Sequence, residues 1–501
     1  MRFTILSLAA CLFLHPLSFA AEKPETEKKE AEQKVEHSEQ EPVVVEGSVT
    51  IGGSKIDYET ITDKLTLKKD DGTPRASIFH VTYLRKGVED TSTRPVLFAF
   101  NGGPGSSAVW LHLGILGPVR VSLPGDGTTA PKPPAKLVPN EFSILDVADL
   151  VFVDPVSTGY SRTEKGGKPD EFHGVRQDVT SLGDFVRRWV SENDRWSSPK
   201  YLLGESYGGI RVAGLSEHLQ SRYGMSLNGV VLLSSLLDFR TLRPGDGDPL
   251  LYMVYLPTYT AVAHYHGKIQ GDRDTLVAQA QEFALGEYAL ALLKGTNLTG
   301  DQRDKIAARL SELTSLDKEA ILKDDLRIDP TSFRSSLLAD EDKVIGRFDA
   351  RVAWPANEGS AAYAAYDPSF SLAFGAYSTA MLSYLTEELG WEEHVPYEIL
   401  SSKVHPWKWT GENEISNLTS ALARAMRDNP HLKVLVMKGA ADLATPPGGI
   451  DYSLSQMLST PDSARERIHH ADYEAGHMFY LNPPDLEKSR ADLLQFLQDT
   501  P

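Results

Sequence analysis

The sequence is poor in cysteine and shows no cluster of basic residues. Its single cysteine among 501 residues is Cys11, so the chain has no intramolecular disulfide and its stability rests on a hydrophobic core. The formal net charge of −18 repels nucleic-acid phosphates and anionic membrane surfaces, so binding to either is not expected. The length suits one large domain with an insertion, or two domains.

Long hydrophobic runs are also missing, except at the N-terminus. Residues 1–20 contain an early arginine, an apolar run over 3–14 and small residues near the end, which predicts a secretory signal peptide cleaved after Ala20. A lipoprotein anchor at Cys11 is the weaker alternative, because the apolar run continues past the cysteine. No other stretch reaches the roughly 18 apolar residues of a membrane span. We therefore expect an exported protein, periplasmic or extracellular.

Apolar residues are scarce between positions 21 and 46. This range holds nine glutamates, four lysines and two prolines. Such a segment buries too little surface to offset the entropy lost on ordering. We expect a disordered acidic spacer, with a partner-binding tail as the alternative.

From residue 47 onward, strand-like and helix-like segments alternate. Short β-rich runs separated by turn residues come first and predict antiparallel hairpins. Unbroken apolar runs, typical of strands covered on both faces, follow at 95–100, 150–154, 201–203, 230–235 and 434–438. Apolar residues recur at helical spacing between them, as from Val175 to Trp189. This alternation predicts a mostly parallel α/β sheet flanked by helices.

Residues 240–425 interrupt the alternation. Helical segments dominate this range, and the buried-strand pattern resumes at Val434. We therefore expect a core in two parts, over 47–239 and 426–501, with a mainly helical cap inserted between them. Insertions of this kind generally set substrate access rather than chemistry.

The first chemistry-bearing motif is Gly204-Glu205-Ser206-Tyr207-Gly208. It follows a short apolar run and precedes a helix-like segment, which is the context in which a G-x-S-x-G elbow holds a serine on a strained turn. Its two glycines allow strand and helix to approach closely. Because so short a motif recurs by chance, Ser206 taken alone fits a nucleophile and an ordinary turn serine about equally well.

A nucleophilic serine needs a base, and the base needs a group that orients it. On an α/β-hydrolase sheet these partners follow the serine in the order acid, then histidine. Asp442, in the loop after the strand at 434–438, is the expected acid, and His477, before the last helix, is the expected base. Asp451 is the rival acid, but it lies where a helix is expected to begin.

The glycine-rich loop FNGGPGSS, at 100–107, directly follows a buried strand. Its small residues let the backbone approach a substrate, and acyl transfer needs two backbone donors for the oxyanion. We expect these donors at Gly103 and Tyr207. His264 and His266, like the adjacent pair near the C-terminus, lack a third ligand at a recognisable spacing. Neither a metal nor another cofactor is therefore expected.

These motifs, in the same order, resemble those of the serine carboxypeptidase family. The similar segments are FNGGPGSS, DPVSTGYS, GESYGG, ADLATP and AGHM, which begin at residues 100, 154, 204, 441 and 475. The resemblance runs from about residue 91 to the C-terminus and is weak in the expected cap. It implies an α/β-hydrolase fold and release of the last amino acid of a peptide through an acyl-enzyme on Ser206, with His477 and Asp442 completing the triad.

The resemblance also implies how a free C-terminus is recognised. The matching positions are Asn101, the N–H of Gly102, and Glu205. A glutamate that faces a substrate carboxylate must be protonated, because two like charges in contact do not both stay ionised. The family pattern therefore predicts that peptide binds best in acid.

Four positions depart from the family pattern. Ile115 replaces a second glutamate, Ala99 a tryptophan and Ser106 a cysteine, and Tyr480 lies near a common proline. The missing cysteine fits a disulfide-free, exported, bacterial branch. Without an acid at position 115, the protonation of Glu205 loses one support, which weakens the expectations of acid preference and of strict exopeptidase action.

The expected function is therefore that of an exported serine-type carboxypeptidase acting on peptides. An esterase or acyltransferase on the same scaffold is the alternative, because one acyl-enzyme passes to water, an alcohol or an amine. Glu205 and Asn101 discriminate between the two, since an ester substrate needs neither. A non-catalytic binding protein using the cap cleft is a remote third, because it has no need of a complete triad.

Overall fold

The structure, a computed structural model, describes residues 41–243, 245–356, 366–410, 415–458 and 460–499. The expected signal peptide over 1–20, the alternative anchor at Cys11 and the first twenty residues of the expected spacer (21–40) lie outside these ranges. Within these ranges, every helix is too short or too polar to reach across a bilayer.

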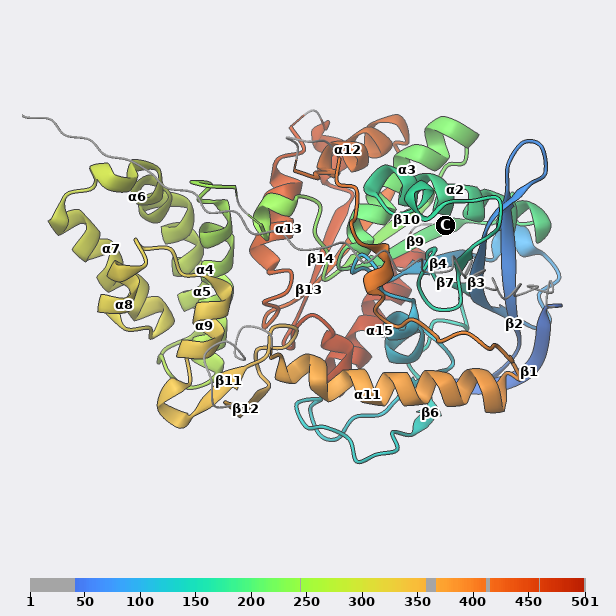
Figure 1. Ribbon diagram of the computed structural model, residues 1–501, viewed down its shortest axis with the longest axis horizontal. Coiled ribbons are helices and arrows are strands. Elements are labelled where there is room, and N and C mark those ends of the chain that lie inside the picture. Colours follow the sequence, from blue (N-terminus) through green and yellow to red (C-terminus); the bar gives the residue numbers. More distant parts are fainter. Residues whose placement is uncertain (1–40, 244, 357–365, 411–414, 459, 500–501) are drawn as a thin grey trace, which may run out of the picture. The chain divides into compact units, whose positions relative to one another are not determined.

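Ten strands of the described chain form one sheet (Figure 1). Its order is β1-β2-β3-β7-β4-β9-β10-β13-β14, and β8 pairs with β3. The bounds are β1 Val43–Ile51, β2 Ser54–Lys68, β3 Pro74–Arg85, β4 Val96–Phe100, β7 Asp149–Val153, β8 Arg162–Thr163, β9 Lys200–Glu205, β10 Gly229–Leu233, β13 Lys433–Gly439 and β14 Ile468–Tyr473. Strands β1, β2, β3 and β7 pair antiparallel, whereas the strands from β7 to β14 pair parallel. The expected mostly parallel α/β sheet is confirmed.

Strand β1 begins inside the range 21–46 that was expected to be a disordered spacer. Val43, Val44 and Val45 pair with residues 60–62 of β2. β-Branched side chains suit a pleated strand, but the surrounding glutamates obscured this short run. The expected boundary at residue 46 is therefore too late.

The central strands are buried on both faces, which explains their unbroken apolar sequences. In β4, Leu97 and Ala99 join one hydrophobic cluster, and Phe98 and Phe100 join another, because successive side chains of a strand point to opposite faces. Helices α11 (Pro368–Ser383) and α15 (Pro483–Gln498) cover the first face. Helices α2 (Val175–Glu192), α3 (Gly208–Tyr223) and α12 (Thr419–Asp428) cover the second, as Figure 1 shows.

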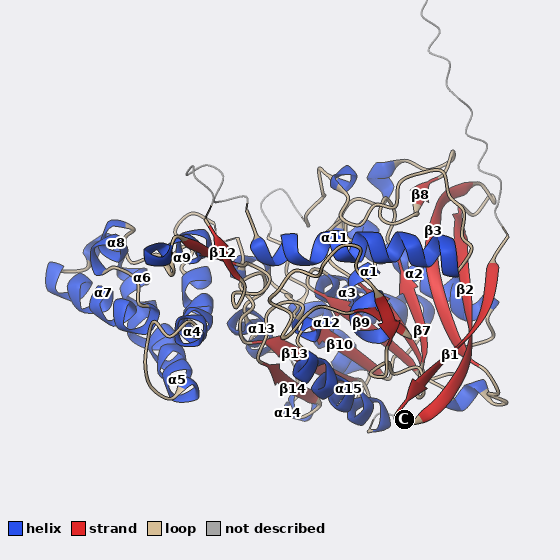
Figure 2. Cartoon of the chain, turned by 90° about the horizontal axis from the view of Figure 1, so that it is seen from below, coloured by secondary structure: helices blue, strands red, loops and turns tan. Residues whose placement is uncertain are grey.

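Residues 240–425, the range expected to hold the inserted cap, divide between two kinds of packing. Helices α4 to α9 surround a hydrophobic cluster of their own, at the left of Figure 2. Their bounds are α4 Leu250–Tyr265, α5 Arg273–Phe283, α6 Ala289–Lys294, α7 Gly300–Thr314, α8 Lys318–Lys323 and α9 Pro330–Ser336. Helix α11, from the same range, and helix α12, which begins in it, pack on the sheet instead. The α4–α9 cluster also takes in Ala441 and Leu443 of the loop after β13.

The remaining strands and α-helices are short and lie in the connections. They are α1 Val109–Leu111, β5 Val119–Val121, β6 Leu137–Pro139, β11 Lys343–Ile345, β12 Ala353–Pro355, α13 Pro447–Ser455 and α14 Asp462–Arg465. The loops that follow β4, β9, β13 and β14 leave the carboxyl ends of parallel neighbours, which is where sites of α/β sheets assemble.

Candidate active site

Ser206 lies on the sharp turn between β9 and α3. Its φ of 62° puts a non-glycine residue in the left-handed region, a strained conformation that persists only when its surroundings hold it. Its N–H donates to the Leu233 carbonyl of β10 at 3.1 Å. A side chain at Gly204 would collide with the carbonyl of Gly208, and one at Gly208 with the carbonyl of Phe100. The turn therefore has the geometry expected of a serine elbow.

Asp442 and His477, from the loops after β13 and β14, are in direct contact. Asp442 Oδ2 lies 2.8 Å from His477 Nδ1. The Thr445 hydroxyl lies 2.8 Å from the same carboxylate oxygen and 2.9 Å from Nδ1. The backbone N–H groups of Ala444 and Thr445 donate to Asp442 Oδ1 at 2.7 and 2.8 Å. These bonds fix both the carboxylate and the plane of the imidazole ring.

The surroundings raise the pKa of the His477 imidazole. Burial lowers this pKa, and the charge of Arg347 lowers it further. The charge and hydrogen bond of Asp442, together with the charge of Glu205, raise the pKa by more than these two effects lower it. The site as a whole therefore stabilises the protonated imidazolium form of His477.

Ser206 and His477 line one cavity of about 410 Å³ together with Asn101, Gly102 and Glu205; we call it the buried-acid cavity. In the described chain the His477 ring forms hydrogen bonds only through Nδ1. Its Nε2 thus remains available to the serine hydroxyl. In ligand-free enzymes such serine–histidine bonds are often long and tighten when substrate binds.

The glycine-rich loop after β4 packs directly against the serine elbow. A Cβ atom on Gly102 would lie 2.8 Å from the carbonyl oxygen of Glu205 and the same distance from Cβ of Ser206. Gly103, with a φ of 101°, lines the buried-acid cavity. Tyr207 precedes the first turn of α3, where N–H groups have no partner within the helix. The two expected oxyanion donors, Gly103 and Tyr207, thus belong to segments that meet at the serine.

Glu205 is the buried carboxyl group of this cavity, with 2% of its surface exposed. Asn101 Nδ2 donates to Oε2 at 2.7 Å, and the Tyr480 hydroxyl donates at 3.1 Å to Oε2 and 3.2 Å to Oε1. Burial raises the pKa of Glu205 to about 7, although the charge of His477 and the hydrogen bonds from Tyr480 and Asn101 lower it. The carboxyl group is therefore protonated in mild acid and ionised in base.

Tyr480 is a partner of Glu205 that the sequence did not reveal. Its ring packs on Gly114, where any side chain would collide with it. The neighbouring Ile115, at the position where a second glutamate was expected, is buried in the main hydrophobic cluster. A tyrosine hydroxyl, rather than a second acid, therefore contacts Glu205. The only sequence signal was the departure from the family pattern at position 480.

A second feature that the sequence did not reveal is the segment over 347–350. It connects the loop that carries Asp442 with the loop that carries His477. The Leu443 N–H donates to the Arg347 carbonyl at 3.1 Å, and the His477 N–H donates to the Phe348 carbonyl at 2.5 Å. A side chain at Gly476 would collide with this segment. These contacts are made by the backbone, so no side-chain motif marks them.

The rival acid and the paired histidines lie elsewhere. Asp451, in α13, forms an ion pair with Lys438 at 2.9 Å, so the acid bonded to His477 is Asp442. His264 Nε2 contacts the Gly271 carbonyl at 3.0 Å, and His266 bonds a backbone carbonyl likewise. The part of the chain that the structure describes contains no group of three residues suited to a metal ion.

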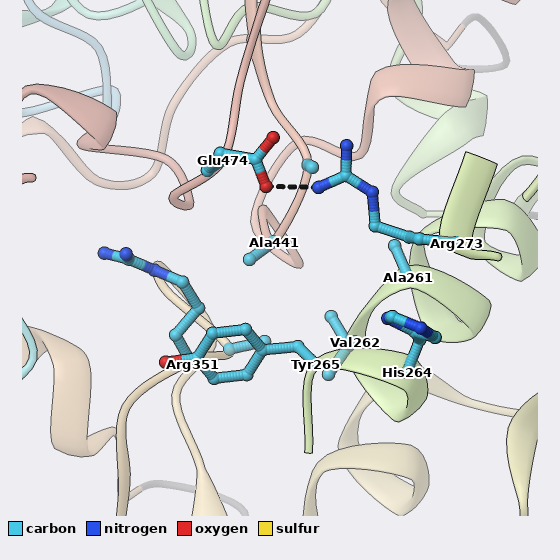
Figure 3. A pocket seen from close by; sticks show the side chains of 10 residues that line it. Ala261, Val262, His264, Tyr265, Arg273, Arg351, Ala441 and Glu474 are labelled. Carbon is cyan, nitrogen blue, oxygen red and sulfur yellow. Dashed lines mark hydrogen bonds and ion pairs between the residues drawn. The ribbon is translucent and has the colours of Figure 1, made fainter. Parts of the chain in front are cut away.

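A separate cavity of about 420 Å³ is lined by Ala441, next to Asp442, and by residues of α4 such as Ala261 and Val262 (Figure 3). Its two arginines are already paired, Arg273 with Glu474 and Arg351 with Asp349. None of the expected site residues lines it, so it is not the site predicted from the sequence.

The fold and the serine elbow together define an α/β hydrolase. The crystal structure of a prohormone-processing carboxypeptidase from Saccharomyces cerevisiae superposes with a TM-score of 0.54 at 15% identity, covering 88% of this chain and 92% of that chain. At this identity the likeness concerns the fold alone.

A family model for serine carboxypeptidases matches residues 69–480. The chain therefore belongs to the serine carboxypeptidase family, as its motifs predicted. Serine carboxypeptidase-like 8 from Arabidopsis thaliana is 28% identical over 139 residues, 27% of this chain and 30% of the relative. Serine carboxypeptidase-like 29 from the same plant is 28% identical over 174 residues, 31% and 32% of the two chains. These alignments span about a third of each relative's length.

Proposed function

We propose that this protein is a serine carboxypeptidase that releases the C-terminal residue of a peptide through an acyl-enzyme on Ser206. One observation carries the proposal: Ser206, His477 and the buried Glu205 line the same cavity. A serine and a histidine suffice for acyl transfer in general. A protonatable carboxyl group beside them, bonded to Asn101, adds a site for a free carboxylate.

In the acylation step, His477 Nε2 takes the proton of the Ser206 hydroxyl while the oxygen attacks the carbonyl carbon of the last peptide bond. The resulting oxyanion accepts hydrogen bonds from the N–H groups of Gly103 and Tyr207. Asp442 holds the ring through Nδ1 and stabilises the imidazolium. The tetrahedral intermediate then collapses, the C–N bond breaks, and His477 gives its proton to the leaving amine.

Deacylation repeats this chemistry with water as the nucleophile. The released amino acid vacates the buried-acid cavity, and a water molecule gives its proton to His477 as its oxygen attacks the ester carbonyl carbon. The second tetrahedral intermediate expels Ser206, which recovers the proton from the imidazolium. The products are a free amino acid and a peptide shortened by one residue.

Recognition of the terminal carboxylate depends on the protonation of Glu205. When protonated, its O–H donates to the substrate carboxylate, and Asn101 Nδ2 and the Gly102 N–H supply further donors. Because burial raises the pKa of Glu205 to about 7, binding of a free-acid peptide is strongest below about pH 7 and is lost as the pH rises through this value. His477 must be neutral to accept the serine proton, and its pKa is raised, so the rate for every substrate falls as the pH drops below neutrality and the free-acid preference is measured relative to the amide and the ester.

Export is part of the proposal. The apolar run over 3–14 and the small residues before Ala21 support cleavage after Ala20. N-terminal sequencing of the protein secreted by its own host is expected to begin at Ala21, and an uncleaved N-terminus on the active protein would contradict it.

The activity is tested with one N-blocked dipeptide prepared as the free acid, the C-terminal amide and the methyl ester, each assayed at pH 5 and pH 8. We expect the free acid to be cleaved preferentially at pH 5 and to lose that advantage at pH 8, while the other two substrates show no such loss. Ester hydrolysis without cleavage of the free-acid peptide would contradict the proposal and indicate an esterase. Ser206→Ala serves as the blank for contaminating peptidases.

A further inference from the structure

A second cavity, of about 230 Å³, opens beside Ser206 on the side of α4 and α9. It shares Ser206, Gly103 and Arg347 with the buried-acid cavity. Neither Glu205 nor Asn101 lines it. We call it the arginine cavity, because three of its lining residues are arginines.

The position of the arginine cavity determines which part of a peptide enters it. In the proposed complex, the terminal carboxylate lies at Glu205 and the attacked carbonyl carbon at Ser206. The chain on the acyl side of that carbon must therefore leave away from Glu205. The arginine cavity also borders Ser206 but not Glu205, so it receives the side chain of the penultimate residue.

The charges of the arginine cavity are unequal. Its lining holds Arg243, Arg334 and Arg347 against a single carboxylate, Asp329. Arg334 donates to the backbone carbonyls of Ile345 and Tyr366 at 3.1 and 2.8 Å. The Asp329 carboxylate accepts from backbone N–H groups at the start of α9. Both of these groups are therefore occupied within the protein.

Unlike Arg334, Arg243 and Arg347 are both exposed. Within the described ranges, neither guanidinium group has a carboxylate within the 4.0 Å of an ion pair, and neither donates a side-chain hydrogen bond. Arginine presents a planar set of donors that matches a carboxylate. Two such groups without acidic partners at the rim of a substrate cavity are suited to an anionic side chain.

Arg347 is held close to the reacting groups. Its carbonyl accepts from the Leu443 N–H, next to Asp442, and its own N–H donates to Asp367 at 3.0 Å. Its guanidinium lies 5.2 Å from the centre of the Phe348 ring, and that ring lies 5.1 Å from the His477 ring. The arginine thus projects from a segment that is fixed to both loops of the site.

We infer that the arginine cavity binds an acidic penultimate side chain, aspartate or glutamate, and that Arg347 and Arg243 determine this specificity. The inference rests on the proposed carboxypeptidase activity and names its preferred substrates as peptides with an acid before the terminal residue. Ion pairs at exposed arginines are individually weak, so we expect the two together to favour glutamate over glutamine by about tenfold at low salt.

The test measures kcat/KM for N-blocked dipeptides that share one terminal residue and carry Glu, Gln, Ala or Lys before it, at pH 6 and low ionic strength. In the unmodified protein we expect a Glu/Gln ratio of about ten, with Lys the poorest substrate. Added salt should lower the ratio, because it screens exposed charges. Arg347→Gln and Arg243→Gln should each lower the ratio severalfold, and Arg347→Glu should favour Lys over Glu.

Arg327→Gln is the matched control. Arg327 is an arginine of the same helical cluster that bonds to the Asp325 carbonyl and stacks on Tyr252, and it does not line the arginine cavity. Its replacement should leave the Glu/Gln ratio unchanged. Turnover of the Ala substrate with equal rates for Glu and Gln would overturn this inference alone. Failure to cleave any of the four peptides would overturn the proposed function, and this inference with it.

Discussion

The two cavities that meet at Ser206 share Arg347 but differ in their other charged groups. In the buried-acid cavity, Glu205 is enclosed and bonded to Asn101 and Tyr480. In the arginine cavity, Arg243 and Arg347 are exposed and have no acidic partner among the described residues. Electrostatic interactions are strong where water is excluded and weak at an exposed rim. Under the proposed function, the first cavity therefore sets a requirement for substrates, and the second only a preference among them.

Both cavities border the Ser206 hydroxyl, which is the proposed nucleophile, and Ser206→Ala removes it. We expect kcat/KM for the free-acid peptide to fall by at least about 10⁴-fold, because loss of a nucleophile removes most of the acceleration in serine hydrolases. The far-ultraviolet circular dichroism and the thermal unfolding midpoint of the variant should match those of the parent. Substantial turnover by the folded variant would exclude Ser206 as the nucleophile.

Glu205→Gln changes the buried-acid cavity but no residue that lines the arginine cavity. The variant keeps a neutral side chain at every pH, so the decline of free-acid cleavage above about pH 7 should disappear. The acid limb should move to slightly lower pH for free acid and ester alike, because the Glu205 charge no longer raises the pKa of His477. Replacement of the O–H donor by a weaker amide N–H donor should lower the free-acid rate at pH 5 by about tenfold. Initial rates from pH 4 to 9 give the result. An unchanged decline near pH 7 would show that another group controls it.

Tyr480→Phe sharpens the comparison by removing one donor to Glu205. The tyrosine hydroxyl favours the ionised carboxylate and lowers its pKa, so the variant should have a higher Glu205 pKa. The alkaline decline of free-acid cleavage should move up by about one pH unit.

Tyr377→Phe is the control for this shift. Tyr377 is also buried, and in the described chain its hydroxyl has no hydrogen-bond partner, so its loss should leave the pH profile in place. A downward shift in Tyr480→Phe, or equal shifts in both variants, would contradict the role given to Tyr480.

Thr445→Val should have the smallest effect, and this effect should be equal for substrates that use either cavity. The Thr445 hydroxyl bonds Asp442 and lies beside His477 Nδ1, so its loss should lower kcat by about five- to tenfold for every substrate. Thr445→Ser keeps the hydroxyl and should restore most of the rate. A change confined to free-acid substrates would contradict a role in positioning the imidazole.

The sequence predicted the sheet well where burial dictates composition. Strands such as β4 and β10 are covered on both faces, and this condition leaves an unbroken apolar run that is visible without a structure. The serine elbow and the order Ser206, Asp442, His477 were likewise visible, because the strained turn and its close approach to the loop after β4 restrict the neighbouring positions to glycine.

The features that the sequence did not predict depend on which loops meet in space. Thr445 and the segment over 347–350 contact His477 through single hydroxyl or backbone groups, which many sequences provide. Tyr480 reaches Glu205 only because Gly114 leaves room for its ring. Arg243 and Arg347 are far apart in the chain, and the pairing of other arginines with acids hides which ones lack a partner.

Covalent labelling tests the central claim, activation of Ser206 by His477, most directly. The tryptic fragment 201–211 contains one serine, Ser206, so mass spectrometry after treatment with diisopropyl fluorophosphate locates the bond formed as fluoride leaves. We predict that the phosphoryl adduct forms on Ser206 in step with loss of peptidase activity, and that His477→Ala slows it by at least about a hundredfold. Inactivation with the adduct on another residue, or equal labelling of the folded His477→Ala variant, would contradict the account.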